Sequence, residues 1–327
     1  MSLLAWLLLL PLLLLALLAW ELLRLLRAQA PGQVRSLQLG SAPARSGPGI
    51  PKVIWSYWNS EALPPLIQAC ADNWRQQAPD HELRFLTPAT LRAWLPEGTD
   101  LSLMQGLPPF RQADWLRLQL LQAHGGLWID ASTLLTTGLD WVQAQQAASG
   151  AEFVGFYIDR LSNRPELPLV ENWFMAAVPG SRFIANLNAE FVRALTMGEA
   201  SYLQALREAG RFDRVIQAID PSLHEYLIMH VAASSLLDAD AGRYRLALQR
   251  AEDSAFALQQ AVGWRKRHLY AKLALCPCPA RVPALLKLRG NDRRVLEQQL
   301  QKRPARRGSL LDRYLPTLRP AHPLDRA

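Results

Sequence analysis

The sequence predicts an α/β sandwich with a largely parallel sheet, preceded by an apolar N-terminal helix. Segments with the composition of strands alternate with segments of helical periodicity between residues 51 and 288, and this alternation is typical of α/β folds. Half of the 327 residues are apolar and a fifth are charged, which is enough to bury the core of one large domain or two ordinary ones. The Gly and Pro contents are too low for a fibrous or disordered protein.

The first 27 residues are predicted to form a transmembrane anchor. From Leu3 to Trp20 there are 18 consecutive Leu, Ala, Trp or Pro residues, and about 20 apolar residues span a bilayer core. A cleaved signal peptide is the alternative, but no Lys or Arg precedes the run, and Arg24 and Arg27 lie where cleavage would fall. Because the basic residues follow the run, we expect a single pass with the body on the cytoplasmic side.

The chain after this run divides into three further parts. Residues 28–49 are rich in Pro, Gly, Ser and Ala without periodicity, which predicts a linker. Residues 50–290 are expected to form the folded domain, and residues 291–327 a basic C-terminal tail.

The domain opens with a strand at residues 51–58, since the Val, Ile, Trp and Tyr found there are typical of buried strands. A Pro-Pro pair then favours the start of a helix over residues 64–78, where apolar residues follow at helical spacing. A second strand is expected at residues 82–86, followed by a short helix at residues 88–95.

The next helix is expected from Pro109 to Ala123, ended by Gly125 and Gly126 as a left-handed cap. A strand over Leu127–Ala131 follows that turn directly. No internal repeat and no Gly-rich phosphate loop of standard spacing is present. Later elements are strands near 153–158, 173–178 and 284–288, and helices over 182–197, 222–237 and 247–260.

Positive charge is concentrated at the C-terminal end. The formal net charge is +8, and residues 281–327 hold 12 Lys and Arg against 4 Asp and Glu, so the rest of the chain is neutral. A nucleic-acid-binding surface is therefore not expected. Intermittent Leu residues accompany the basic ones, so we expect the tail to bind anionic membrane lipids, with a disordered solubilising tail as the alternative. Three cysteines exclude a disulfide scaffold and a four-thiolate zinc site.

A candidate site lies where the predicted helix and strand meet. Asp114 and Arg117 are three residues apart and so share one helix face. The Gly125-Gly126 turn brings the next strand back beside this helix, so Asp130, at the carboxyl end of that strand, is expected near the pair. Ligands of such folds gather at carboxyl ends of strands, and two carboxylates with a guanidinium suit a metal-bound, hydroxyl-rich anion.

Each residue also has a purely structural interpretation. Asp130 by itself fits a cap or turn aspartate, and the Asp114–Arg117 pair fits a solvated surface ion pair worth under about 1 kcal/mol.

These residues resemble a known family. Residues 50–58, I-P-K-V-I-W-S-Y-W, are similar to the opening strand of bacterial capsular polysaccharide synthesis glycosyltransferases. Residues 111–117 and 124–132 resemble the central signature of that family, an (S/A)-D-x-x-R helix followed by G-G-x-(W/Y)-(I/L)-D. This signature is shared with the wider DxD sugar-binding-region transferases, including mannosyltransferase-like and toxin-like members. Segments near residues 171–177 and 220–226 are also similar, so the resemblance covers about residues 50–289.

The resemblance implies a GT-A fold, that is, a Rossmann-like nucleotide-sugar-binding sandwich, with Mn²⁺ or Mg²⁺ as cofactor. Asp114 and Arg117 match the pair that holds the donor sugar, and Asp130 matches the first aspartate of the DxD motif, which meets metal and sugar. Ser132 replaces the second aspartate. The implied metal site is therefore Asp130 with Ser132, and because a hydroxyl is a weaker ligand than a carboxylate, metal dependence is open.

Three further residues are assigned to donor binding. Trp55 and Tyr57 belong to the strand whose following residues contact the nucleotide base in the family, although Trp55 fits an ordinary core tryptophan equally well. Lys287, on the last predicted strand, is placed to add positive charge near the donor diphosphate, with a solvated surface lysine as the alternative.

The function implied is a retaining hexosyltransferase of capsular or cell-surface polysaccharide synthesis, with Asp130, Arg117 and Asp114 as its catalytic residues. It would use a nucleotide-sugar donor and a glycan acceptor, expected to be lipid-linked, at the bacterial inner membrane. Two alternatives stay open: a catalytically inactive scaffold protein on the same fold, supported by the Asp-Ala-Ser sequence, and a hydrolase or phosphotransferase that uses Asp130 with a metal.

Overall fold

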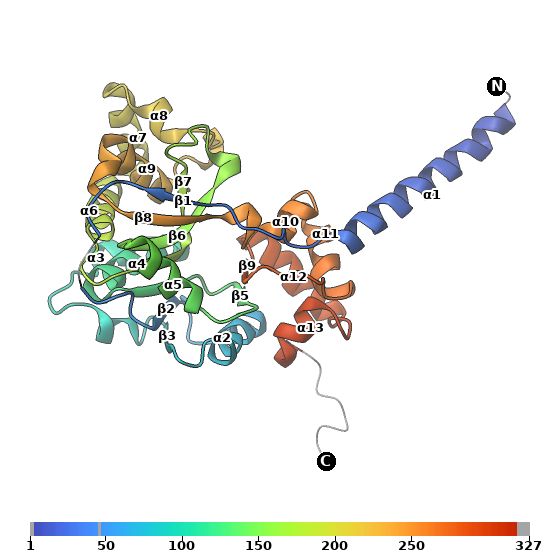
Figure 1. Ribbon diagram of the computed structural model, residues 1–327, viewed down its shortest axis with the longest axis horizontal. Coiled ribbons are helices and arrows are strands. Elements are labelled where there is room, and N and C mark those ends of the chain that lie inside the picture. Colours follow the sequence, from blue (N-terminus) through green and yellow to red (C-terminus); the bar gives the residue numbers. More distant parts are fainter. Residues whose placement is uncertain (1–2, 45–46, 319–327) are drawn as a thin grey trace, which may run out of the picture.

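The computed structural model describes residues 3–44 and 47–318, with side chains from Leu10 onward. This part of the chain is an α/β fold, as expected, built on a seven-stranded sheet of order β1-β8-β6-β7-β4-β2-β3 and a small sheet of β5 and β9 (Figure 1). The strands are β1 (Ser36–Leu39), β2 (Val53–Tyr57), β3 (Glu82–Leu86), β4 (Gly126–Ile129), β5 (Thr133–Leu135), β6 (Phe153–Ile158), β7 (Leu169–Ala177), β8 (Leu246–Arg250) and β9 (Leu285–Lys287).

Helices pack against the large sheet and continue into a C-terminal group. Helices α4 and α9 contact β7, while α5 contacts β6 and β8. Helices α10 to α13 gather between the large sheet and α1 (Figure 1). The helices are α1 (Leu3–Arg27), α2 (Pro65–Gln77), α3 (Ser102–Gln105), α4 (Pro109–His124), α5 (Asp140–Ser149), α6 (Arg182–Met197), α7 (Glu199–Glu208), α8 (Phe212–Ile216), α9 (Ile228–Asp240), α10 (Ala257–Ala261), α11 (Lys266–Tyr270), α12 (Gly290–Lys302) and α13 (Leu310–Tyr314).

Three neighbouring strands of the large sheet run parallel. β2 pairs with β3 on one side and with β4 on the other, so the carboxyl ends of all three meet at one edge. The remaining pairings include β1 with β8, β4 with β7 and β6 with β7, which are antiparallel, so half of the six pairings are parallel. The expectation of a largely parallel sheet is therefore wrong. The connection from β6 to β7 holds only a three-residue helical turn, and parallel strands need a crossover of about a dozen residues or more.

Two local predictions also need correction. A helix was expected over residues 247–260, but Leu246–Arg250 is the strand β8 and only Ala257–Ala261 is α-helical. Leu246 and Leu248 are buried between β1 and β6, and a short apolar run fits a buried strand and a helix equally. Residues 36–39, within the expected linker, form the edge strand β1 through main-chain pairing with β8.

The N-terminal helix α1 projects from the C-terminal group (Figure 1). Within the part of the chain that the structure describes, no helix is both long enough and apolar enough to cross a membrane. The predicted transmembrane anchor, and the single-pass inner-membrane location that rested on it, are therefore wrong. The last two turns of α1 carry the charged residues Glu21, Arg24 and Arg27.

The last turn of α1 is attached to the C-terminal group. Arg265 Nη1 lies 2.8 Å from Glu21 Oε1, and Lys272 Nζ donates to the main-chain oxygen of Leu26 at 3.2 Å. Burial lowers the pKa of Lys272. This end of the helix is therefore held by the body of the protein.

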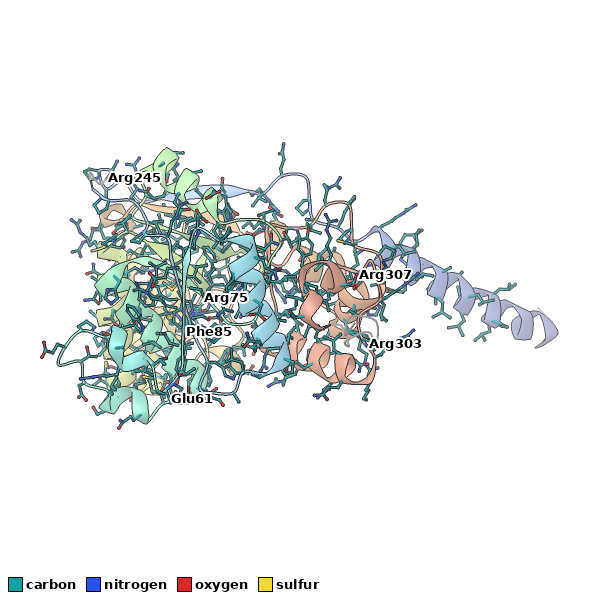
Figure 2. The ribbon with its side chains drawn as sticks, turned by 90° about the horizontal axis from the view of Figure 1, so that it is seen from below. Glu61, Arg75, Phe85, Arg245, Arg303 and Arg307 are labelled. Atoms are coloured by element: carbon teal, nitrogen blue, oxygen red, sulfur yellow. The ribbon has the colours of Figure 1, made fainter. Side chains whose placement is uncertain are left out.

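The basic C-terminal segment is folded over residues 290–318. Its apolar stripe faces inward, because Leu296, Leu310, Leu311 and Leu315 are buried in the core, so these side chains are not free to insert into a membrane. Basic residues such as Arg303 and Arg307 stay exposed on the C-terminal group (Figure 2).

Candidate functional site

A pocket of about 630 Å³ opens at the shared carboxyl edge of β2 and β4. Side chains from both sheets and from three α-helices, α4, α9 and α12, line it. They include Tyr57 and Trp58 after β2, Asp114 and Arg117 on α4, Asp130 and Ser132 after β4, Glu171 and Asn172 on β7, Lys287 on β9, and Arg289 and Arg293 at the start of α12.

Helix α4 is oriented by its apolar face. Trp115, Leu116 and Leu118 are buried in the core, so the remaining face of the helix carries Asp114 and Arg117 towards the pocket. The helix ends at Gly125, which has φ +66°, and Gly126 follows with φ +94°. A Cβ at Gly126 would lie 2.8 Å from the main-chain oxygen of Val53. Only glycine allows β4 to start this close to β2, which is what brings Asp130 to the pocket.

The structure brings together the three residues that the sequence predicted to meet. Arg117 Nη2 lies 3.0 Å from Asp114 Oδ1 and 3.2 Å from Asp130 Oδ1. The indole nitrogen of Trp128 also donates to Asp130 Oδ1 at 2.9 Å. Arg117 and Asp114 are almost fully buried, whereas the side chain of Asp130 is 26% exposed and faces the pocket.

Lys287 completes this cluster from the opposite sheet. β5 and β9 pair antiparallel with Thr133 opposite Lys287, so the lysine is held next to the end of β4. Its Nζ lies 2.8 Å from Asp130 Oδ2 and 3.0 Å from Ser132 Oγ. The Ser132 hydroxyl donates to the main-chain oxygen of Leu288 at 2.9 Å.

The two carboxyl groups respond differently to this environment. Burial raises the pKa of Asp130, but the charges of Lys287 and Arg117 more than offset it, so the pKa lies below its usual range. Burial raises the pKa of Asp114, and the opposing charges of Arg117 and Arg111 do not compensate fully. Asp130 is therefore the carboxylate at the pocket surface, while Asp114 is the buried member of the pair.

Sequence reasoning missed several partners of Asp114. Arg111 Nη1 lies 2.9 Å from Asp114 Oδ2, and Asn172 Nδ2 lies 3.0 Å from Asp114 Oδ1. Arg111 stands three residues before Asp114, so helical spacing could have found it. Asn172 lies on β7, and only strand order brings it here. Another buried pair, His230 and Glu171 at 3.3 Å, also lines the pocket.

The two aromatic residues predicted on the first strand have different surroundings. Tyr57 lines the pocket, and its hydroxyl lies 2.9 Å from Gln112 Oε1. Trp55 is fully buried, donates to the main-chain oxygen of Gly125 at 2.9 Å and stacks on His124. Both side chains share one face of β2, but Trp55 lies about 6.6 Å further from the carboxyl edge. The structure therefore places Trp55 behind the site, outside the pocket.

The residues that would hold a divalent ion do not suit one. Asp130 already accepts from Trp128, Arg117 and Lys287, and Ser132 Oγ binds Lys287 and a carbonyl. Over residues 3–44 and 47–318, no group of three or more His, Cys, Asp or Glu side chains is arranged to bind a metal. Mg²⁺ demands oxygen ligands at about 2.0–2.1 Å, and the oxygens here are already bound to cations and N–H donors.

Comparison with known proteins identifies the family. Residues 34–196 match the family model of capsular polysaccharide synthesis proteins. The family recognised in the sequence is thereby confirmed over about half of the chain.

A curated relative of this chain is the O-glycosyltransferase braB of Annulohypoxylon truncatum. It is 30% identical over 151 residues, which are 41% of this chain and 35% of that protein. The chain therefore spans about a third of the length of this relative.

Two solved structures of glycosyltransferases show a distant likeness. The PaToxG glycosyltransferase is 13% identical, with a TM-score of 0.33, over 68% of this chain and 86% of its own. The UDP-bound glycosyltransferase domain of the YGT toxin is 8% identical, with a TM-score of 0.38, over 85% of this chain and 96% of its own.

Proposed function

We propose that this protein is a glycosyltransferase that moves a hexose from a nucleotide-sugar donor to a glycan acceptor in capsular or cell-surface polysaccharide synthesis. The observation that carries the proposal is Asp130, a pocket carboxylate held between Arg117 and Lys287 at the carboxyl edge of β2 and β4. The family match and the glycosyltransferase relative support the same activity.

The pocket has the charge that a donor diphosphate needs. Five basic side chains and three acidic ones line it, and of the five, Arg289 and Arg293 are paired with Asp292 and Glu297 outside the lining. Cationic N–H groups are therefore present at the pocket surface for an anion. Lys287 uses two of its three N–H donors within the protein. Arg160 and Arg289 both lie over the ring of Trp264, at 4.3 and 4.8 Å from its centroid. These cations would hold the diphosphate, where a planar guanidinium binds two oxygens at once.

The carboxylates have room for sugar hydroxyls. A carboxylate offers about four acceptor positions, and three are filled on Asp130 and three on Asp114. One position on each therefore remains for a hydroxyl of the hexose. Asp114 also positions Arg117, which makes four contacts with protein oxygens and retains one free N–H donor.

In the proposed reaction, the bond between the anomeric carbon and the diphosphate oxygen breaks and its electron pair stays on the diphosphate. The oxygen of the acceptor hydroxyl bonds to the anomeric carbon and loses its proton to the departing phosphate oxygen. The products are the glycoside and the nucleoside diphosphate. Attack on the face that the diphosphate leaves gives retention. Arg117 and Lys287 stabilise the charge that grows on the leaving group, a contribution that is commonly the largest in such sites.

The acceptor would approach over an exposed aromatic pair at the pocket rim. The rings of Phe110 and Tyr226 lie 5.1 Å apart, are 43% and 55% exposed, and both line the pocket. Large exposed apolar side chains at a pocket rim mark a binding surface, and ring faces suit the C–H faces of a sugar. A lipid carrier for this glycan, and anionic lipid as a partner, would involve the exposed Arg303, Arg306 and Arg307.

The test is turnover by the full chain with UDP- and GDP-hexoses and oligosaccharide acceptors, measured as released nucleoside diphosphate. We expect release from donors of one base that increases when an acceptor is added. Asp130→Asn should abolish release, while Lys302→Ala, an exposed basic residue far along α12, serves as the matched control. Binding of a donor without any turnover would favour the scaffold alternative, and release of inorganic phosphate alone would favour the phosphotransferase or hydrolase.

A further inference from the structure

We propose that Lys287 occupies the place of the divalent metal ion in this site, so that the donor diphosphate binds directly to its ammonium group and no metal is required. The inference rests on the proposed function, since it concerns how that donor is held. It replaces the metal site that the resemblance implies for Asp130 and Ser132.

The first argument is position. The ammonium of Lys287 contacts both residues that correspond to the ends of a D-x-D motif, at 2.8 Å from Asp130 Oδ2 and 3.0 Å from Ser132 Oγ. A cation that bridges these two atoms is therefore already part of the protein. A metal ion could enter only by displacing Lys287, whose side chain is 10% exposed.

The second argument is charge. Two carboxylates balance one divalent cation, whereas one carboxylate and one hydroxyl balance a single ammonium group. The change from Asp to Ser at position 132 and the presence of Lys287 therefore compensate each other. An aspartate at position 132 would place a second carboxylate against this ammonium group, whereas the serine hydroxyl accepts from Lys287 and donates to the main-chain oxygen of Leu288.

The third argument is rigidity. The main chain of Lys287 is fixed on both sides, because its N–H donates to Ala255 O at 3.2 Å and its oxygen accepts from Gln259 Nε2 at 2.6 Å. The strand β9 is also paired with β5 in register. A preorganised cation stabilises a developing negative charge without reorganisation during the reaction, and a lysine on a paired strand meets that condition.

The experiment is titration calorimetry of the full chain with UDP and GDP, each in excess EDTA and in excess MnCl₂, with uridine and guanosine as phosphate-free probes. We expect the preferred nucleotide to bind in EDTA with an affinity within about threefold of that in Mn²⁺. Lys287→Met should weaken nucleotide binding in EDTA by about tenfold or more and leave nucleoside binding unchanged. Lys302→Ala is the matched control and should change neither.

A second readout uses the paramagnetism of Mn²⁺. Electron paramagnetic resonance of Mn²⁺ mixed with the wild-type protein and nucleotide should show no protein-dependent loss of the free-ion signal. Lys287→Ala uncovers Asp130 and Ser132, so this variant should regain nucleotide affinity when Mn²⁺ is added.

The outcomes separate the inference from the function. Nucleotide binding by the wild type only in Mn²⁺ would overturn the inference and leave the proposed function standing. No nucleotide binding in either condition would overturn both. The wild-type comparison does not depend on the variants, so it decides the question even if a change at Lys287 prevents folding.

Discussion

Replacing Arg117 by lysine keeps the positive charge but removes the planar fork that joins Asp114 to Asp130. In the structure, the guanidinium also donates to the main-chain oxygens of Ala113 and Asn172. Lysine has three donors on one nitrogen, and it can pair with one of the carboxylates. Because Arg117 is nearly fully buried, the other carboxylate loses one of its three donors, and one carbonyl loses its hydrogen bond to the side chain of residue 117.

The magnitude follows from those losses. A hydrogen bond to a charged group contributes about 1.5–3 kcal/mol, and leaving a buried carbonyl unpaired costs about 1–3 kcal/mol. We expect Arg117→Lys to lower the free energy of unfolding by about 3 kcal/mol, which is about 4 °C in Tm for a chain of this size. Transfer should fall by about 100-fold or more in kcat/KM, since the fork no longer positions Asp130.

The matched variant is Arg111→Lys on the same helix. Arg111 pairs with Asp114 from the other side, at 2.9 Å, and is equally buried, but among the described contacts it makes none with Asp130. We expect a similar loss of stability and a much smaller loss of transfer. Thermal melting and steady-state kinetics of both variants give the comparison. Equal losses of activity in the two variants would refute the argument that Arg117 acts by joining the two carboxylates.

Three further outcomes are expected. Asp130→Ala should abolish transfer while the melting curve still shows one cooperative transition, and a folded variant with wild-type turnover would remove Asp130 from the mechanism. Asp238→Asn should lower the free energy of unfolding by about 2–3 kcal/mol without changing kcat. The reason is that the buried carboxylate of Asp238 pairs with Arg164, Arg211 and Arg214. An unchanged midpoint of urea unfolding would contradict this expectation. Burial raises the pKa of Asp238, but these arginines lower it overall, so its stabilisation is present above about pH 4 and is lost as the pH falls through the lower folded-state pKa. Wild-type stability should therefore decline below about pH 4 more steeply than that of the Asn variant, and parallel declines would show that Asp238 does not titrate there.

The parts of the fold that the sequence predicts well are those with a local signal. Helix α4 was expected over Pro109–Ala123 and extends over Pro109–His124, because a proline starts it and Gly125 ends it. Strand β8 was mistaken for a helix, since its apolar residues 246–248 are consecutive and show no clear period. Strand β1 escaped notice because its residues are mostly exposed and its only signal is main-chain pairing with β8.

The candidate site likewise contains residues that a local sequence signal predicts and residues that it does not. Asp114, Arg117 and Asp130 stand within one helix-turn-strand unit, so spacing and the two glycines were enough to predict that they meet. Asn172 and Glu171 arrive on β7, whose order in the sheet has no local signal. Trp55 and Tyr57 share one face of β2 and differ only in their distance from the carboxyl edge of the sheet. Tyr57, which is nearer to that edge, lines the pocket, and Trp55 lies behind it.

The metal prediction rests on a short motif, and the structure adds a residue to it that the motif does not contain. Asp130 resembles the first aspartate of the D-x-D motif of the family. The divalent metal ion was predicted from that resemblance. The cation paired with this carboxylate is Lys287, which lies 157 positions further along the chain. It contacts Asp130 only because β9 pairs with β5. The hydroxyl of Ser132 accepts from that lysine and donates to the main-chain oxygen of Leu288. In the arrangement that we propose, the ammonium group of this distant lysine takes the position between Asp130 and Ser132, and the donor diphosphate would bind to it there.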